Sequence, residues 1–203
     1  MTPTGAAVRD NRWRVAPEDL VVMTPRGEVV ERGRYASAAS TVQVLMLLEA
    51  FPEVNAVIHT HARWSRVYAA AGLSLPPAIT SMDRYGDVPC IRIDEHVLKA
   101  RYREAPWVTF VPEAMNTSRP DIAAVNAAIA ERAIELLDGR RDQFAWHGLG
   151  YTMYRHGLVV VSPSLERAVQ DATAMESSCE TALGVAVLQL TGADVNGLAV
   201  QAV

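Results

Sequence analysis

The chain has 203 residues, half of them hydrophobic and 21% charged, which is the composition of a globular domain large enough to bury a core. We therefore expect a single domain over residues 1–203. The formal net charge of −4 offers no basic surface for nucleic acid. No apolar stretch approaches the roughly 18 to 20 residues that span a bilayer.

The first third of the chain predicts two short strands, a helix and a third strand. The first segment, MTPTGAAVRDNRW, lacks the apolar core of a signal peptide. The turn Pro25-Arg26-Gly27 separates the short strands expected at 19–24 and 28–31. A buried helix is expected over 40–50, ending before Pro52. The β-branched run NAVIHTHA then predicts a strand.

A helix ending near Gly72 and a strand at 88–93 follow. Apolar residues then recur at helical spacing over 120–138, a pattern that predicts a helix ending at Gly139. The members of this pattern are Ile122, Val125, Ile129, Ala133 and Leu136. Two strand-like segments, YTMY and LVVVS, flank Arg155-His156-Gly157. Ser162 and Pro163 are expected to open a final helix that runs to about Leu190, with the serine as N-cap.

Strands and helices are mixed in this order without regular βαβ alternation. We therefore expect an α/β fold with a central, largely antiparallel sheet covered by helices. No GxGxxG and no P-loop occurs, so nucleotide binding has no sequence support. The two cysteines, Cys90 and Cys179, lie far apart in sequence and outside any metal-type spacing, which indicates a reducing cytoplasm.

His59 and His61 lie two residues apart in a predicted strand, so their side chains leave the same face. Neutral imidazoles side by side can bind a divalent metal. The alternative is a pair of polar strand residues, but unpartnered imidazoles are costly to bury in an apolar strand. His156 precedes Gly157 at a bend, where a histidine is more often a locally hydrogen-bonded turn residue.

The string FPEVNAVIHTHARWSRVYAAAG resembles the signature of the class II aldolase/adducin family. RHGLVVVSPSLERAVQDATAMESSCETAL resembles a later block of that family, and MTPTG and VAPEDLVVMTPRGEVVERG resemble its earlier segments, in the same order. The resemblance implies an α/β/α sandwich and a homotetramer. It also implies a divalent metal, zinc first, with iron or manganese as alternatives, bound by His59, His61 and His156.

The chain departs from the family where aldolases carry a Ser-Ser-Glu element, whose glutamate is the acid/base and whose serines hold the substrate phosphate. The matching positions here are Ala38, Ala39 and Ser40. A serine hydroxyl is not a base at neutral pH without a partner of its own. Thr4 and Gly5 still match the family's phosphate contact. Most of the family's phosphate contacts are nevertheless missing. These departures from the family therefore predict a carbonyl substrate without a phosphate.

Other acid/base candidates are weaker. Tyr85, in the loop SMDRYGDVP with Asp83 and Asp87, is a candidate proton donor, although a loop tyrosine more often serves packing. His147 lies nine residues before His156, and a lone loop histidine is more often structural or exposed. We expect His96 to be a solvated surface residue and the charged run at 140–143 to be a solvated loop.

Three functions remain open at this point. The first is a metal-dependent lyase in which the metal is a Lewis acid, catalysing aldol-type cleavage, decarboxylation or dehydration of an unphosphorylated carbonyl compound. The second is an iron-dependent oxygenase or oxidative decarboxylase of a natural-product pathway in secondary metabolism. The third is a non-catalytic, adducin-like binding protein. Metal identity separates the first two, and retention of stoichiometric metal argues against the third.

Overall fold

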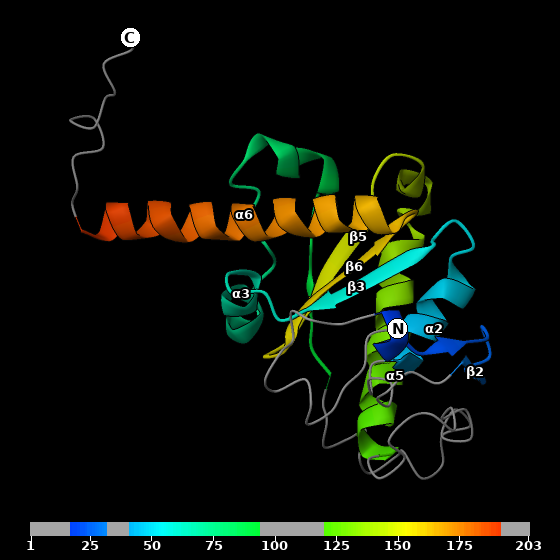
Figure 1. Cartoon of the computed structure of the whole chain (residues 1–203). Helices are drawn as coiled ribbons and strands as arrows, with labels where there is room; N and C mark the ends of the chain where they lie inside the picture. Colours follow the sequence, from blue (N-terminus) through cyan, green and yellow to red (C-terminus); the bar gives the residue numbers. More distant parts are fainter. Residues whose placement is uncertain (1–16, 32–40, 94–119, 192–203) are drawn as a thin grey trace.

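A computed structural model of the chain describes residues 17–31, 41–93 and 120–191 (Figure 1). Six residues discussed above lie outside these ranges, in segments that the structure does not describe. They are Thr4, Gly5, Ala38, Ala39, Ser40 and His96.

The centre of the fold is a four-stranded sheet in the order β3-β6-β5-β4. Its strands are β3 (Ala56–Thr60), β4 (Cys90–Ile91), β5 (Leu149–Met153) and β6 (Gly157–Ser162). β6 pairs antiparallel with both β3 and β5, whereas β4 pairs parallel with β5. The expected α/β class and antiparallel pairing are confirmed, and β4 is the one parallel addition within this sheet.

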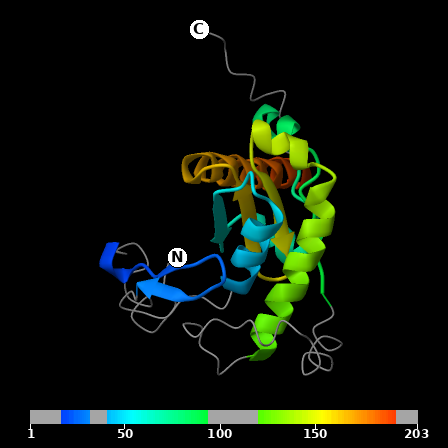
Figure 2. The ribbon, with the colours of Figure 1, turned by 90° about the vertical axis from the view of Figure 1, so that its right-hand side faces the viewer.

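A separate two-stranded antiparallel sheet is formed by β1 (Val22–Met23) and β2 (Val29–Glu31), after the short 3₁₀ helix η1 (Pro17–Asp19). The turn between the strands includes Gly27, whose φ of 81° lies in the left-handed region that glycine tolerates. Both predicted strands are present, although β1 is shorter than the expected 19–24, because Asp19 belongs to η1. Figure 2 shows this hairpin at the edge of the molecule, apart from the larger sheet.

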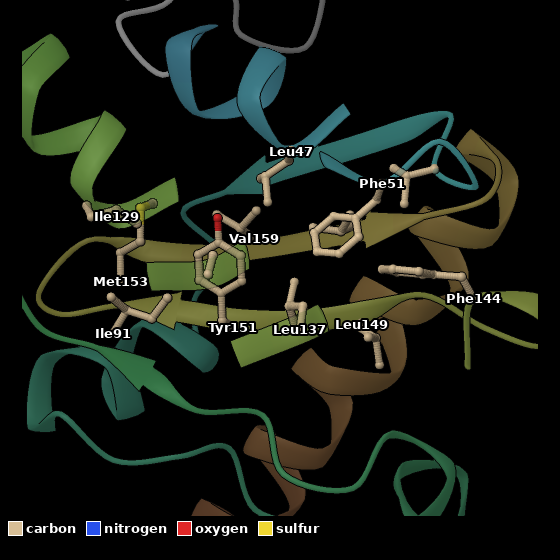
Figure 3. Packing of buried hydrophobic residues seen from close by; sticks show 13 residues of the cluster. Leu47, Phe51, Ile91, Ile129, Leu137, Phe144, Leu149, Tyr151, Met153 and Val159 are labelled. Atoms are coloured by element: carbon tan, nitrogen blue, oxygen red, sulfur yellow. The ribbon is translucent and has the colours of Figure 1, made fainter. Parts of the chain in front are cut away.

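Apolar side chains leave both faces of the larger sheet, because residues alternate between faces along a strand. On one face, Val159 and Tyr151 pack against residues of α2 (Thr41–Ala50) and α5 (Pro120–Asp138), including Leu47 and Ile129 (Figure 3). Phe144, in the 3₁₀ helix η5 (Arg141–Ala145), packs into the same cluster.

The opposite face packs against α3 (Ser65–Ala71), the 3₁₀ helix η2 (Thr80–Tyr85) and the long helix α6 (Leu165–Leu190). Leu158 and Val160 of β6 point to this side and contact a cluster that includes Met175 of α6. Helices therefore cover both faces of a mixed sheet, the layered arrangement that the sequence predicted (Figure 1). Among the helices that the structure describes, none combines the length and apolar character needed to cross a bilayer.

Two local predictions are wrong. Ser162 is not the N-cap of α6, because β6 continues through this residue and pairs it with Ala56. The N-cap is Ser164, whose hydroxyl oxygen accepts a hydrogen bond from the backbone N–H of Arg167 at 3.2 Å. The run at 140–143 is not simply a solvated loop, because the Arg140 guanidinium donates to the backbone carbonyls of Tyr85 and Asp87.

Candidate metal centre

Three histidines come together at one end of the central sheet. His59 belongs to β3, His61 follows its last residue, and His156 lies in the turn between β5 and β6. Their ring centroids are 5.0 Å apart for His59 and His61, 4.9 Å for His59 and His156, and 4.8 Å for His61 and His156. One nitrogen of each imidazole lies within 4.8 Å of the others.

The strand pairing explains why residues so distant in sequence meet. β3 and β6 are antiparallel, so the end of β3 lies beside the beginning of β6, with Thr60 opposite Leu158. His156 immediately precedes β6 and therefore lies next to the end of β3. His59 pairs with Val159, and its side chain leaves the sheet on the face that also bears Tyr151.

The turn that carries His156 has an unusual backbone. Arg155 adopts a φ of 57°, the left-handed region that L-residues other than Asn, Asp and His seldom enter. Two backbone hydrogen bonds hold this turn: the N–H of Arg155 donates to the carbonyl of Ala69, and that of His156 to Met153. The imidazole of His156 is thereby presented from a turn fixed to both α3 and β5.

Gly157 allows the close approach of the two segments. A Cβ atom at this position would lie 2.4 Å from the backbone oxygen of Thr60 and 3.0 Å from Cδ2 of His61. Backbone atoms cannot move aside as the end of a flexible side chain can. The glycine after His156 is therefore required by the packing of β6 against the residues that present His61.

The protonation and surroundings of His59 suit a metal ligand. Burial, followed by the charges of His156 and His61, lowers the pKa of His59 to about 4. Its imidazole is therefore neutral at neutral pH, the form that binds metal. Within the part of the chain that the structure describes, Nε2 of His59 is buried and has no hydrogen-bond partner. A buried polar atom without a partner is costly, and a metal ion would satisfy it, so the residues present fit a divalent metal.

Tyr85 and His147 lie together in a different cluster. The Tyr85 hydroxyl donates to Oδ1 of Asp171 at 2.8 Å, and its ring contacts the His147 ring edge-on at a centroid distance of 5.1 Å. Both side chains are buried, and burial, reinforced by the hydrogen bond to Asp171, raises the pKa of Tyr85. These contacts favour the packing interpretation of Tyr85, and Asp83 and Asp87 beside it are exposed.

Asp171 is the centre of this second cluster, and the sequence patterns did not single it out. Its carboxylate also accepts hydrogen bonds from the backbone N–H of Gly148 at 2.8 Å and the hydroxyl of Ser162 at 3.1 Å. Asp171 lies on the α6 face that packs on the sheet, where an apolar residue is the usual expectation. A lone acidic residue on the buried face of an amphipathic helix was the available signal.

A family model and several known proteins match most of the length of this chain. The family model described as Class II Aldolase and Adducin N-terminal domain matches residues 1–183. The L-ribulose-5-phosphate 4-epimerases UlaF of Salmonella typhi and Salmonella paratyphi B are each 28% identical over 162 residues, which cover 78% of this chain. The chain spans 59% of the length of these epimerases.

Two solved structures share the fold. An L-fuculose 1-phosphate aldolase matches with a TM-score of 0.57 at 21% identity, over 94% of this chain and 68% of that chain. YgbL from Escherichia coli matches with a TM-score of 0.52 at 22% identity, over 92% of this chain and 72% of that chain.

Proposed function

The chain belongs to the class II aldolase and adducin family, and from this premise we propose that it is a divalent-metal-dependent lyase acting on an unphosphorylated carbonyl compound. The observation that carries the proposal is the cluster of His59, His61 and His156, in which Nε2 of His59 is buried and finds no hydrogen-bond partner among the described residues.

Three imidazoles are the ligand set of a catalytic rather than a structural metal site, because they leave coordination positions for a substrate. A divalent metal in this place, zinc first among the candidates, would supply Lewis-acid polarisation of a carbonyl oxygen. His61 and His156 are exposed, and His59 is half-buried, so the open side of the cluster faces solvent and is accessible to a small molecule. Aldol-type cleavage, decarboxylation and dehydration next to a carbonyl all fit this chemistry.

The substrate class follows from the residues at the family's phosphate and acid/base positions. The relatives named above carry phosphorylated sugars in their names. Here Ala38 and Ala39 stand where the family has its phosphate-binding serines, and Ser40 stands where it has glutamate. An alanine side chain offers no hydrogen bond to a phosphate oxygen, so only Thr4 and Gly5 would still match the family's phosphate contacts. An unphosphorylated substrate fits this composition better.

Metal analysis of the purified 203-residue chain tests the proposal. We expect about one transition-metal ion per chain, and we expect His59→Ala and His61→Ala each to lose it. His147→Gln is the matched control, because His147 is buried outside the cluster and should leave the metal content unchanged. Full metal occupancy in both alanine variants would contradict the proposal. Iron rather than zinc after anaerobic purification would favour the oxygenase alternative.

A further inference from the structure

The segment that carries His61 is held at its far end by a side chain from another helix. Glu176, on α6, accepts hydrogen bonds from the backbone N–H of Trp64 on Oε1 at 2.5 Å and of Ser65 on Oε2 at 2.8 Å. Both carboxylate oxygens are thus used, and the donors are the N-cap residue and the first residue of α3. Hydrogen bonds to an ionised acceptor are stronger than those between neutral groups.

α3 has no side-chain cap of its own at its N-terminus. The N-cap position is occupied by Trp64, in an αR conformation with φ −89° and ψ −44° and without a side-chain hydrogen bond, and the first turn contains no acidic residue. The first N–H groups of a helix need acceptors, and negative charge is favourable at this end. Glu176 supplies both from more than a hundred residues away along the chain.

The connection between β3 and α3 is therefore fixed at both ends. At one end, Thr60 pairs with Leu158 in the sheet. At the other end, Trp64 is bound by Glu176. Only three residues lie between, and the first of them is His61. His59 lies within β3, and His156 is held in its turn by its own backbone hydrogen bonds. A change in the conformation of this short connection would therefore displace His61 more than the other two histidines.

We propose that Glu176 is a positioning residue of the histidine cluster, which holds the connection 61–64 in the conformation that brings the His61 imidazole to those of His59 and His156. The inference rests on the proposed metal site for its functional meaning. It assigns no contact between Glu176 and the metal or the substrate.

A second contact of the same kind provides the control. Ser178, two residues further along α6, accepts a hydrogen bond from the N–H of Ala78 at 2.8 Å and donates to the carbonyl of Pro76 at 2.6 Å. Ser178 thus fastens another loop to α6, and that loop contains no histidine. Loss of either contact weakens the packing of α6, but only loss of the Glu176 contact should affect the histidines.

The experiment compares Glu176→Ala, Glu176→Gln and Ser178→Ala in the full chain. Co²⁺ is the probe: its affinity is measured by competition with a chelator, and its ligand-field absorption spectrum reports the coordination geometry. We expect Glu176→Ala to weaken Co²⁺ binding by about tenfold or more and to alter the spectrum. Glu176→Gln keeps one acceptor oxygen and should recover part of the affinity. Ser178→Ala should lower the melting temperature and leave affinity and spectrum unchanged.

Wild-type affinity and spectrum in both Glu176 variants would overturn the inference, as would an equal loss of affinity in Ser178→Ala. If Glu176→Ala does not fold, the Co²⁺ affinity and spectrum of Glu176→Gln alone test the inference. Absence of Co²⁺ binding by the wild-type chain would instead overturn the proposed function. In that case the His61 ring resonances of the metal-free proteins test the positioning role: a shift in Glu176→Gln, absent from Ser178→Ala, supports it, and identical resonances reject it.

Discussion

At the scale of single residues, Gly157 shows how much the histidine cluster depends on the absence of a side chain. We expect Gly157→Ala to displace His61, because the new methyl group would overlap the backbone oxygen of Thr60. Overpacking of this kind typically costs about 1–3 kcal/mol of the free energy of unfolding. The melting temperature and the metal affinity should therefore both fall.

Gly184→Ala is the control, since among the described residues no atom outside the adjoining stretch of α6 lies within 4 Å of a Cβ atom at that position. Alanine is the better helix residue, so this variant should gain about 0.5–1 kcal/mol in stability and bind metal normally. Normal metal affinity in Gly157→Ala would show that the packing at this position does not set the place of His61.

A second residue-scale prediction concerns Ser40 and the reaction that the chain can catalyse. If it stands in the place of the aldolase glutamate, the wild-type chain should show negligible retro-aldol activity on fuculose- or ribulose-type sugar phosphates, because losing one positioned acid/base typically costs about 10²–10⁴-fold in rate. Ser40→Glu should recover little, since Ala38 and Ala39 still leave the phosphate unbound. Its carboxylate should instead change the metal affinity. Ser74→Glu, at an exposed position, controls for the added charge.

A panel of sugar phosphates, assayed with both variants and the wild type, measures this. Wild-type turnover within tenfold of ordinary aldolase rates would mean that another residue supplies the base, and the proposal of an unphosphorylated substrate would fall.

The histidine cluster itself could be predicted from the sequence, whereas its support could not. The spacing of His59 and His61 in a strand, joined to the resemblance around His156, brought together the three residues that the structure places side by side. The role of Glu176 could not be predicted, because its hydrogen-bond partners are backbone N–H groups. The residue types in a sequence do not show which backbone groups will be bound.

At the scale of elements, Asp171 joins parts of the fold that come from four places in the sequence. Its carboxylate on α6 accepts from Tyr85 of η2, Gly148 before β5 and Ser162 of β6. We expect Asp171→Ala to cost about 2–4 kcal/mol, because it leaves these buried donors without an acceptor. Thermal and urea unfolding measure the loss.

Asp83→Ala is the matched control, because Asp83 is exposed on η2, close in sequence to Tyr85. Its stability should stay within about 0.5 kcal/mol of the wild type. An equally small change in Asp171→Ala would show that water or a rearranged side chain satisfies the same donors.

The elements were largely predictable, because hydrophobic periodicity is a local property. The helix over 120–138 and the end of α3 at Gly72 appear where the sequence predicts them. The beginning of α6 was wrong by two residues, since both Ser162 and Ser164 are suitable caps and only the pairing of Ser162 with Ala56 decides between them. Strand partners far away in sequence are not visible in a local pattern.

At the scale of the whole molecule, the C-terminal part of α6 extends beyond the sheet and the other helices (Figure 1). It exposes apolar side chains, among them Val187 at 58% and Leu190 at 87%. A run of exposed apolar residues suits burial against another chain, so we expect a homo-oligomer, and a tetramer from the family resemblance. Multi-angle light scattering at micromolar concentration should give a mass several times that of one chain.

Glutamate at both Val187 and Leu190 should shift this mass toward the monomer, because two charges would be buried in the contact. Val30→Glu, at a residue 68% exposed on β2, is the control and should leave the assembly intact. A monomeric wild-type chain, or an unchanged mass in the double variant, would contradict the assignment of this helix end to a subunit contact.

The meeting of His59 and His156 across the β3–β6 pairing also has a consequence for the lifetime of the protein. The two residues are separated by about half of the chain, and the unfolded chain would have to close that long loop to bring them together. An ion bound by both would therefore select the folded state, adding about 2.7 kcal/mol when free metal is a hundred times its dissociation constant. Resistance to proteolysis should then rise with the concentration of available metal. In cells short of the ion, the metal-free protein should be degraded faster than the metal-bound protein.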